Sequence, residues 1–323
     1  LPLCRALAAW FDRDKMMFKF LFWRLMRACL TMFLVLVMAF TTMRISGTPF
    51  EIMYVMEGIT PEIQAALEKR YGLDRPWIEQ FWVYLVDISQ GNFGRSIATS
   101  EYVWGMLASK RPHAVTVGGL ALVLAIVVGS PLGACAALYR SNPASRFGMG
   151  MAFLGYSIPH FVIGIGLILI FGFYLQVLPT TGLGSLKHYL LPVITLAIPM
   201  VAGIARFMRA SMLDAIGQAY VATAVSKGLD DNTVARRHIL RNSLIPLITV
   251  LGLEVAGLMN GSIFVEAVYS LPGVGRVLID AVEVRDYPVL QFGLIAYALI
   301  VVCTNLIIDV CYVLADPRIR LEG

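Results

Sequence analysis

Two long stretches of this sequence contain no Asp, Glu, Lys or Arg, namely Ala114 to Leu138 and Gly148 to Leu175. A helix needs about 20 apolar residues to cross a bilayer, where every backbone N–H must find its partner within the segment. Both stretches exceed that length. Hydrophobic residues make up 58% of the chain and charged residues 15%, which is too little polar surface for a water-soluble protein of this size. The sequence therefore predicts an all-α polytopic membrane protein.

Four further stretches are long and apolar enough to cross the membrane, so we predict six transmembrane helices. The first of them contains Arg24 and Arg27 near one edge, where long side chains can reach the headgroups. The four stretches are Phe20 to Met43, Tyr189 to Ala205, Leu244 to Val265 and Val289 to Ile308.

The distribution of Lys and Arg predicts the orientation, because short cytoplasmic loops are enriched in them. Sixteen fall at the amino end, in the loop after the second span, in the segment Arg206 to Arg241 and in the carboxyl tail. The short loops on the opposite side hold only Lys187, Arg276 and Arg285. Both termini are therefore expected to be cytoplasmic, and this orientation accounts for the basic pI without a nucleic-acid partner.

The first span divides the chain. The residues before Met16 and Met17 look like an addition ahead of the natural start. The predicted divisions are an upstream extension at 1–15, the first transmembrane helix at 16–43, an extracytoplasmic helical region at 44–112, and a five-helix core at 113–323 with a polar cytoplasmic segment at 209–243.

The extracytoplasmic region is predicted to be helical. Thr60 is expected to cap a helix that begins at Pro61 and stops at Gly72. A second amphipathic helix is expected over Pro76 to Ile88, and a third short helix behind Ser100. Two interpretations fit this pattern: a cap over the outer mouth of the bundle, or a docking surface for an exported protein.

The cytoplasmic segment is predicted to contain two short helices joined by a turn. Ala219 to Lys227 has helix-forming composition and ends at Gly228, and Asp230 or Asp231 can cap the next helix. A helix faced with Ala and Val fits a groove on a partner protein, but the same basic helices would also suit a surface of anionic lipid. The basic residues of the second helix are Arg236, Arg237, His238 and Arg241.

Glu254 is a carboxylate within a predicted span. Such a group is costly unless it faces a polar cavity or a partner, so we expect it to line a pathway or to form a structural hydrogen bond. Asn260 and Ser262 continue on the same span toward the outside. Gly257 and Gly261 have the spacing that lets another helix approach closely.

A second polar segment precedes the last span. Pro272, Gly273 and Gly275 require a turn, after which a short helical run is expected. Arg285 and Asp286 follow, where the chain turns back into the membrane, and they have the charges to pair with each other. The plain interpretation is a re-entrant plug over the bundle.

Several motifs together resemble one family. A-T-A-V-S-K-G-L at Ala222 to Leu229, followed by R-R-H-I-L-R-N-S-L-I-P at Arg236 to Pro246, resembles the coupling segment of ABC-importer permease subunits of the dipeptide, oligopeptide and nickel branch. The resemblance covers Met17 to Arg320. Further similar motifs are Y-G-L-D at Tyr71 to Asp74, G-N-F-G-R-S at Gly91 to Ser96, Y-S-I-P at Tyr156 to Pro159, S-L-P-G-V-G-R at Ser270 to Arg276, R-D-Y-P-V at Arg285 to Val289 and D-P-R-I-R at Asp316 to Arg320.

The resemblance implies a type I ABC-importer permease fold and three sets of functional residues. Residues that couple to an ATPase would be Ala222, Thr223, Ala224, Gly228, Leu229, Arg236, His238, Arg241 and Asn242. Residues along the translocation pathway would be Glu254, Asn260 and Ser262. Residues of an outer gate that contacts the binding protein would be Pro272, Gly273, Gly275, Arg285, Asp286 and Tyr287.

The resemblance also implies partners. The chain contains no G-x-x-x-x-G-K-[ST] run for ATP phosphates, so ATP and Mg would be held by one or two cytoplasmic ATPase subunits, with no cofactor on this chain. His160 and His188 lie apart from Cys or carboxylate clusters, and no metal site is predicted. A second related permease chain and an extracytoplasmic binding protein would complete an importer in a bacterial inner membrane. Its cargo would be small peptides or nickel chelates, with glutathione or opines as other options.

Two other classes of protein were weighed against this interpretation. A secondary transporter or channel would need no docking helix, and would be expected to show inverted repeats or several intramembrane charges. A membrane enzyme would need clustered His, Asp or Glu at one interface, and no such cluster is apparent in the sequence. The chain itself is therefore expected to be non-catalytic.

Overall fold

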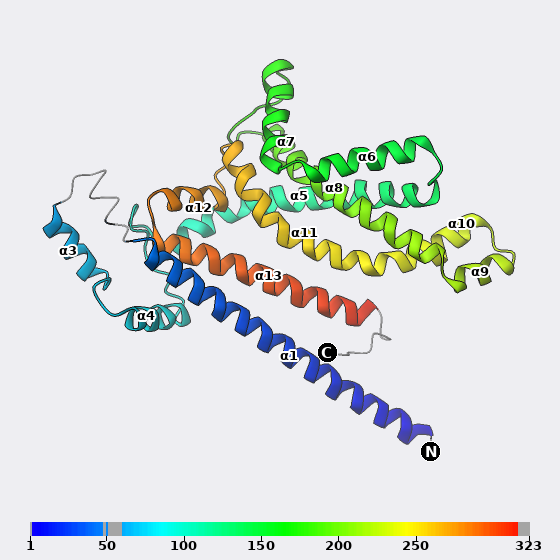
Figure 1. The fold of residues 1–323 in the computed structure, drawn as a ribbon, viewed down its shortest axis with the longest axis horizontal. Coiled ribbons are helices and arrows are strands. Elements are labelled where there is room, and N and C mark those ends of the chain that lie inside the picture. The colour runs from blue at the N-terminus through cyan, green and yellow to red at the C-terminus, as the bar shows by residue number, and fades with distance from the viewer. Residues whose placement is uncertain (1, 48–49, 51–59, 316–323) are drawn as a thin grey trace. The chain divides into compact units, whose positions relative to one another are not determined.

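A computed structural model describes residues 2–47, 50 and 60–315 of the protein (Figure 1). The chain forms two compact units, one of Leu1–Met106 with Asp280–Gly323 and one of Leu107–Ile279. Within the described residues all regular secondary structure is helical, apart from one isolated bridge between Arg95 and Tyr102. The predicted all-α class is confirmed.

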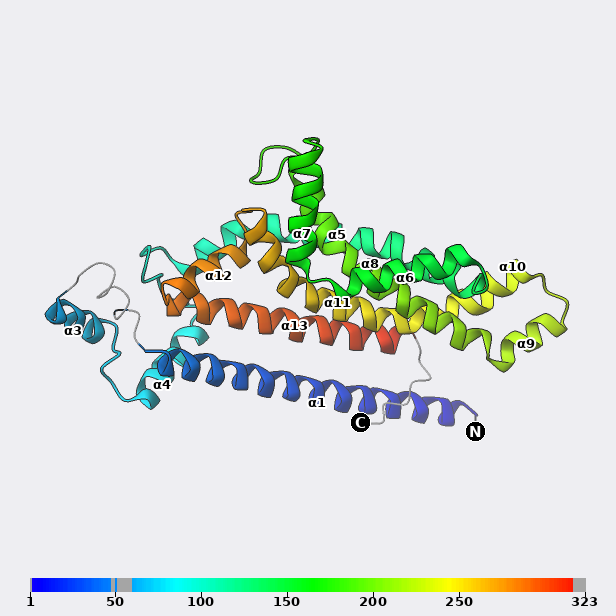
Figure 2. The ribbon, with the colours of Figure 1, turned by 45° about the horizontal axis from the view of Figure 1, so that its top comes forward.

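In the first unit, two long helices run antiparallel side by side, α1 (Pro2–Ile45) and α13 (Tyr287–Ala315) (Figures 1 and 2). The helices α3 (Pro61–Arg70) and α4 (Trp77–Ser89) match the two predicted in the extracytoplasmic region. Thr60 caps α3 as expected, since its Oγ1 accepts from the N–H of Ile63 at 3.4 Å. The helix α1 passes through residues 2–15 without a break, and their status as an extension stays a prediction.

The third helix begins behind Ser100 as predicted, but the prediction that it is short is wrong. The structure has instead the start of α5 (Val103–Leu138), which continues as one helix into the predicted span. Pro112 lies inside this helix and removes one backbone donor without ending it. Thr116 supports this turn, because its hydroxyl donates to the carbonyl of Pro112 at 2.8 Å.

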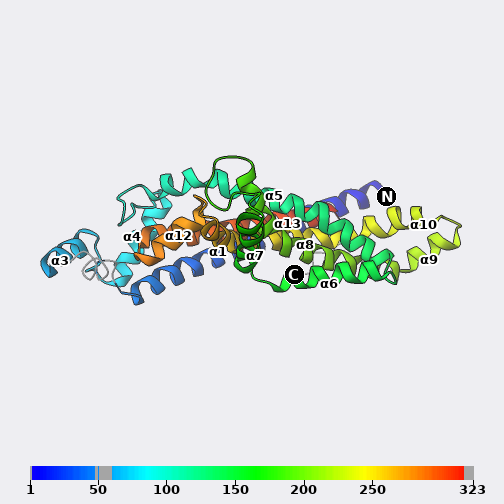
Figure 3. The same ribbon diagram turned by 90° about the horizontal axis from the view of Figure 1, so that it is seen from above.

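The second unit contains most of α5 and the chain from there to α12. The apolar stretch Gly148 to Leu175 is not one continuous helix, because the chain bends by 107° between its two halves. Ile158 is extended, as expected for a residue before proline, and Pro159 starts the next helix. Figure 3 shows α7 end-on while α6 lies in the plane of the view. The elements after α5 are α6 (Pro143–Ser157), α7 (His160–Leu167), a π-helix η1 (Ile168–Tyr174), α8 (Lys187–Ile216), α9 (Ala219–Ser226), α10 (Asp231–Thr233), a π-helix η2 (Val234–Leu240), α11 (Arg241–Val268) and α12 (Val274–Glu283).

Four described helices are long and apolar enough to cross a membrane, and six spans result if each of two bent pairs counts as one. The bent pairs are α6 with α7 and the two parts of the segment from Asp231 to Leu258. The chain is thus a multi-pass membrane protein, while the number six and the cytoplasmic termini stay predictions.

The core of the second unit is built around α8. In the apolar window of α8, 67% of the residues are buried, against 33% or less in the other three spanning helices. Two glycines of α5 let it approach α8 closely: a Cβ at Gly129 would lie 2.8 Å from the carbonyl oxygen of Val201, and one at Gly133 would lie 2.3 Å from that of Ala205. The sequence analysis did not identify this contact. It holds α5 and α8 together as one unit.

Candidate functional site

The predicted docking helix exists as α9, and its end has a defined geometry. The N–H of Gly228 donates to the carbonyl of Val225 at 2.9 Å, and the N–H of Leu229 donates to that of Ala224 at 3.4 Å. This pair of bonds is a Schellman motif, which needs a left-handed residue after the helix. Gly228 supplies it with φ of 77°. Nothing among the described residues lies within 4 Å of its Cβ position, so backbone conformation requires glycine there.

One face of α9 is anchored and the other is open. Val221 and Ala224 are buried in the core of the second unit, beside Val234 and Ile239 of the following helix. The remaining predicted coupling residues of this helix and its end are exposed. They are Ala222, Thr223, Gly228 and Leu229. The exposed face of α9 thus carries the small side chains of Ala222 and Thr223 beside Tyr220 and Val225, and Ala224 belongs to the buried face.

The helix after the turn is longer than expected. Asp230 caps it by accepting from the N–H of Thr233 at 3.0 Å, and hydrogen bonds from Thr233 lower the pKa of this carboxylate. The short α10 continues through the π-helix η2 directly into α11. The structure therefore has one short helix and one long one, where two short helices were predicted, because Pro246 lies inside α11 without ending it.

The basic residues of this segment lie where η2 meets α11. Arg236 and Arg241 are exposed, and His238 is half-buried. Asn242 is exposed and donates through Nδ2 to the carbonyl of His238 at 2.8 Å. π-Helical turns are rare and occur frequently at functional sites.

Hydrogen bonds tie the base of this segment to the helices of the bundle. The hydroxyl of Ser211 in α8 donates to the carbonyl of Ser243 in α11 at 3.1 Å. The buried hydroxyl of Ser243 donates in turn to the carbonyl of Ile239 in η2 at 2.8 Å. A displacement of α9 would therefore act on α8 and α11 together.

Glu254 lies against α8. It is half-buried, and its Oε1 would be only 2.5 Å from a Cβ at Gly203. Arg206, one turn along α8, interacts electrostatically with it and stacks over the ring of Tyr156 at 4.4 Å. The carboxylate thus has a cation nearby within its own chain. This contact is compatible with both the pathway and the structural interpretation.

The other predicted pathway residues follow Glu254 on α11. Ser262 is half-buried, and the side chain of Asn260 lies outside the described part of the structure. A Cβ at Gly261 would lie 3.0 Å from Leu196 of α8, whereas nothing described lies within 4 Å of Gly257. Within this chain, only Gly261 of the predicted pair is in a close helix contact.

A second carboxylate, Glu266, was missed by the sequence analysis. It is 4% exposed, and its Oε2 accepts from the N–H of Gly275 at 2.6 Å and from that of Arg276 at 3.3 Å. These are N–H groups of the first turn of α12, where a carboxylate is stabilised by the helix dipole. The sequence feature that could have pointed to Glu266 is its position directly after the predicted span and shortly before Pro272.

This carboxylate explains the glycines of the predicted turn. A Cβ at Gly273 would lie 2.1 Å from Cδ of Glu266. A Cβ at Gly275 would lie 2.5 Å from the backbone Cα of Ile263. The turn with Pro272 is thus wrapped around Glu266. The predicted helical run after the turn is α12.

In the first unit, Asp286 joins two of the sequence motifs. It is 2% exposed and accepts from the hydroxyl of Ser96 at 2.5 Å and from the N–H groups of Ile97 and Ala98 at 3.2 and 3.3 Å. Asp286 directly precedes α13, and Ser96 ends the G-N-F-G-R-S motif. The carboxylate therefore fixes the loop that contains Ser96 to the start of α13.

Aromatic packing strengthens this junction. The ring of Phe93, from the same loop, lies 4.3 Å from that of Phe292 on α13, with Trp104 against both. The hydroxyl of Tyr287 donates to the carbonyl of Gly47 at the end of α1. Arg285 is half-buried beside this site, with φ of 51°.

We expect Asp286→Ala to destabilise the first unit by about 2 kcal/mol, because a buried hydroxyl and two N–H groups lose their acceptor. The measurement is thermal unfolding of the purified protein in detergent. Asp74→Ala, which removes an exposed carboxylate of the same unit, is the matched control. Equal melting temperatures for the two variants would contradict the prediction.

Two family models match this chain. The one described as "Binding-protein-dependent transport system inner membrane component" matches residues 129–321. The one for the N-terminal part of such membrane components matches residues 17–118.

Curated relatives match nearly the whole chain. The dipeptide transport system permease protein DppB of Lactococcus lactis subsp. cremoris (strain MG1363) is 35% identical over 307 residues, which are 94% of this chain and 100% of the relative. The glutathione transport system permease protein GsiC of Escherichia coli (strain K12) is 37% identical over 300 residues, which are 93% of this chain and 98% of the relative.

Solved structures show a similar fold. A chain of the MetNI methionine ABC transporter in an inward-facing conformation aligns with a TM-score of 0.56 at 17% identity, covering 68% of this chain and 100% of that chain. A chain of an amino acid ABC transporter with histidines aligns with a TM-score of 0.52 at 17% identity, covering 64% of this chain and 93% of that one.

Proposed function

The chain belongs to the family of binding-protein-dependent transport system inner membrane components, the permease subunits of ABC importers, and from this premise we propose how it works. It forms half of a translocation pathway, together with a second, related permease chain. One or two cytoplasmic ATPases hold ATP and Mg, and an extracytoplasmic binding protein delivers the cargo. The chain lies in a bacterial inner membrane with six spans and both termini in the cytoplasm, and it carries no catalytic site or cofactor of its own.

The observation that carries this proposal is that α9 is buried on one face and exposed on the other. Its buried face, with Val221 and Ala224, is anchored in the core, while Ala222 and Thr223 are exposed. Such a helix can enter a cleft of an ATPase without moving relative to its own bundle. Closure of the ATPases would then displace α9 and, through its packing against η2, that helix as well. The hydrogen bonds of Ser243 with Ile239 and Ser211 would pass the movement on to α11 and α8.

The movement would reach the middle of the membrane along α11. Glu254 lies on this helix against Gly203 of α8, so any shift between the two helices changes the surroundings of the carboxylate. Glu254, Asn260 and Ser262 are proposed to line the pathway. The outer gate is proposed to include the turn at Pro272, Gly273 and Gly275 in one unit, and Arg285, Asp286 and Tyr287 in the other.

We propose small peptides as the cargo. The relatives named above are described as dipeptide and glutathione transport proteins, and glutathione is itself a small peptide. Their names give no support to nickel chelates. Uptake of labelled dipeptide, glutathione and nickel chelate by cells with and without this chain tests the choice, and loss of nickel uptake alone would overturn it.

The proposed coupling role of α9 is tested by placing a bulky side chain on its exposed face. We expect Ala222→Trp to reduce the ATPase that copurifies with the tagged chain by about tenfold or more, because a bulky side chain that overpacks a close interface costs about 1–3 kcal/mol and about 1.4 kcal/mol is tenfold in affinity. The copurified ATPase is quantified by mass spectrometry, with ATP hydrolysis measured in parallel. Ala144→Trp, at an exposed position of α6, is the matched control.

Two results would decide against the proposal. If Ala222→Trp retains the ATPase at the control level, the exposed face of α9 is not the docking surface. If the unaltered chain purifies without any ATPase, the channel or secondary-transporter alternative returns. Ala224 is unsuitable for this test, because a bulky side chain there would damage the core.

A further inference from the structure

The depth of α4 follows from its contacts with α1. The ring of Phe81 lies 6.4 Å from that of Phe33 and 5.2 Å from that of Phe40. Phe33 lies within the apolar stretch Phe22–Ile45, twelve residues before its end, which is about 18 Å of helix. The helix α4 therefore packs beside the membrane-embedded end of α1. Arg44, near the end of that stretch, donates through Nε to Oε1 of Gln80 on α4 at 2.6 Å. The first turn of α4 is thus level with the end of the apolar stretch, where headgroups meet hydrocarbon in a bilayer, although α4 belongs to the region predicted to be exported.

The outward face of α4 suits that depth. Ile78 is 86% exposed and Trp82 67% exposed, and Val86 continues the same face at a spacing of four residues. Trp77 at the start of the helix is exposed as well. Apolar and Trp side chains on one face are typical of helices that lie in the interface of a bilayer. This face of α4 is therefore suited to contact with lipid.

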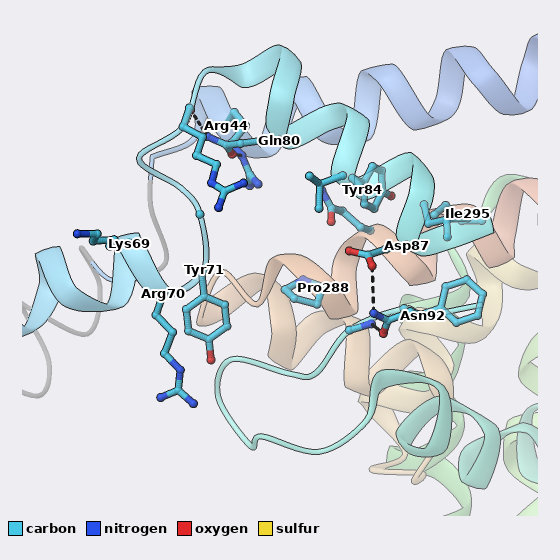
Figure 4. Close-up of a pocket in the computed structure, with 17 residues that line it drawn as sticks. Arg44, Lys69, Arg70, Tyr71, Gln80, Tyr84, Asp87, Asn92, Pro288 and Ile295 are labelled. Atoms are coloured by element: carbon cyan, nitrogen blue, oxygen red, sulfur yellow. Dashed lines mark hydrogen bonds between the residues drawn. The ribbon is translucent and has the colours of Figure 1, made fainter. Parts of the chain in front are cut away.

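The opposite face of α4 borders a pocket of about 340 Å³ within the first unit (Figure 4). The pocket lies between α4, the ends of α1 and α3, and the start of α13. Figure 4 shows Tyr71, Asp87 and Pro288 around it, each from a different segment. Arg44, near the end of the apolar stretch of α1, places the pocket at the same boundary depth.

The charge of the pocket is positive. Its wall contains four cations and one carboxylate, Asp87, which accepts from Asn92 at 3.2 Å. Arg75 pairs with Glu79 at 2.9 Å, whereas Lys69 and Arg70 are exposed at the rim. The four cations are Arg44, Lys69, Arg70 and Arg75. An anion is the ligand that this wall favours.

Two buried donors also line the pocket. Gln291 is 8% exposed, and its Nε2 has no hydrogen-bond partner among the described residues. The buried hydroxyl of Tyr84 likewise has none within the described part of the chain. Burial raises the pKa of Tyr84, which keeps its proton available for donation. Buried donors ordinarily have an acceptor, and an anionic oxygen would supply one.

We propose that this pocket binds the phosphate headgroup of an anionic phospholipid, whose acyl chains lie along the exposed apolar surface of α4 and α1. The boundary depth and the adjacent apolar face favour a lipid over a soluble anion. The lipid would fasten the region between α1 and α5 to the membrane surface. This site is independent of the proposed transport function.

The test measures bound lipid on the purified protein with the subunits that accompany it. The protein is equilibrated in mixed micelles with equal amounts of phosphatidylglycerol and phosphatidylcholine, and the retained lipids are quantified by mass spectrometry. We expect phosphatidylglycerol to be enriched. The double variant Lys69→Gln with Arg70→Gln should reduce its retention by about tenfold, because each cation near a membrane surface contributes to the attraction.

A matched control removes two exposed cations elsewhere, through Arg140→Gln with Arg146→Gln. Gln291→Leu is a further variant that keeps the net charge and should also reduce retention of phosphatidylglycerol. Equal losses in the control and test variants, or no preference for phosphatidylglycerol, would overturn the proposal. Displacement of the lipid by soluble glycerol phosphate would assign the site to a soluble anion instead. None of these readouts depends on ATPase binding or uptake.

Discussion

Replacing Gly133 by valine is expected to abolish the folded protein, or to destabilise it by about 3 kcal/mol or more. The Cβ of any residue at this position would lie 2.3 Å from the carbonyl oxygen of Ala205 and 2.8 Å from the Cβ of Met208. The first of these atoms belongs to the backbone of α8 and cannot rotate away. The helices would have to separate, and the contact at Gly129 would be lost with them. Close approach of this kind drives helix association in membranes, where lipid is as apolar as the side chains.

The yield of monodisperse protein after extraction, together with its melting temperature, measures this effect. Gly119→Val makes the same change on the same helix, at a position where nothing described lies within 4 Å. It should leave yield and melting temperature close to those of the unaltered protein. Similar losses for both variants would mean that helix propensity, and not the contact with α8, is responsible.

Gly273→Ala is expected to have the second large effect, and its size should depend on Glu266. In the unaltered protein the new methyl group would overlap the buried carboxyl group, at 2.1 Å from Cδ. That group cannot move freely, because Oε2 is held by the N–H groups of Gly275 and Arg276. We expect the free energy of unfolding to fall by about 2–4 kcal/mol, because the core is overpacked and the hydrogen bonds are displaced.

Glu266→Ala removes the same carboxyl group and should itself destabilise the protein by about 2 kcal/mol, since the first turn of α12 loses its cap. In that background, Gly273→Ala should have little further effect. Thermal unfolding of the two single variants and the double variant gives the coupling energy. If the losses of stability in the two single variants add up to that of the double variant within about 0.5 kcal/mol, the carboxylate does not occupy the space in front of Gly273.

Features that depend on neighbouring residues in the chain were predicted well. The cap at Thr60, the end of α9 at Gly228 and the turn before α12 follow from backbone conformation and local hydrogen bonds. Prolines were less informative. Pro159 lies at a bend of 107° and Pro246 at a bend of 40° within α11, whereas Pro112 lies within α5. Only the fold decides how far each proline bends or breaks its helix.

Features that depend on distant neighbours were not predicted. Gly133 looks like any other glycine of an apolar stretch, and its importance comes from the backbone of α8. In the sequence Glu266 lies just outside the predicted span, and its hydrogen-bond partners follow in the first turn of the next helix. Ser96 and Asp286 belong to motifs that the sequence shows separately, and the hydrogen bond between them requires the folded first unit. The opposite directions in which α9 presents Ala222 and Ala224 likewise became clear only with η2 and α8 in place.

The π-helical turn of η2 also sets an angle. A turn closed by bonds to the fifth residue holds more residues than an ordinary helical turn. Each residue of an α-helix corresponds to a rotation of about 100°. The widened turn therefore rotates the preceding elements about the axis of α11, and with them the exposed face of α9. The winding of the seven residues Val234–Leu240 thus sets the direction from which the proposed ATPase would approach, although these residues lie at some distance from the proposed docking face.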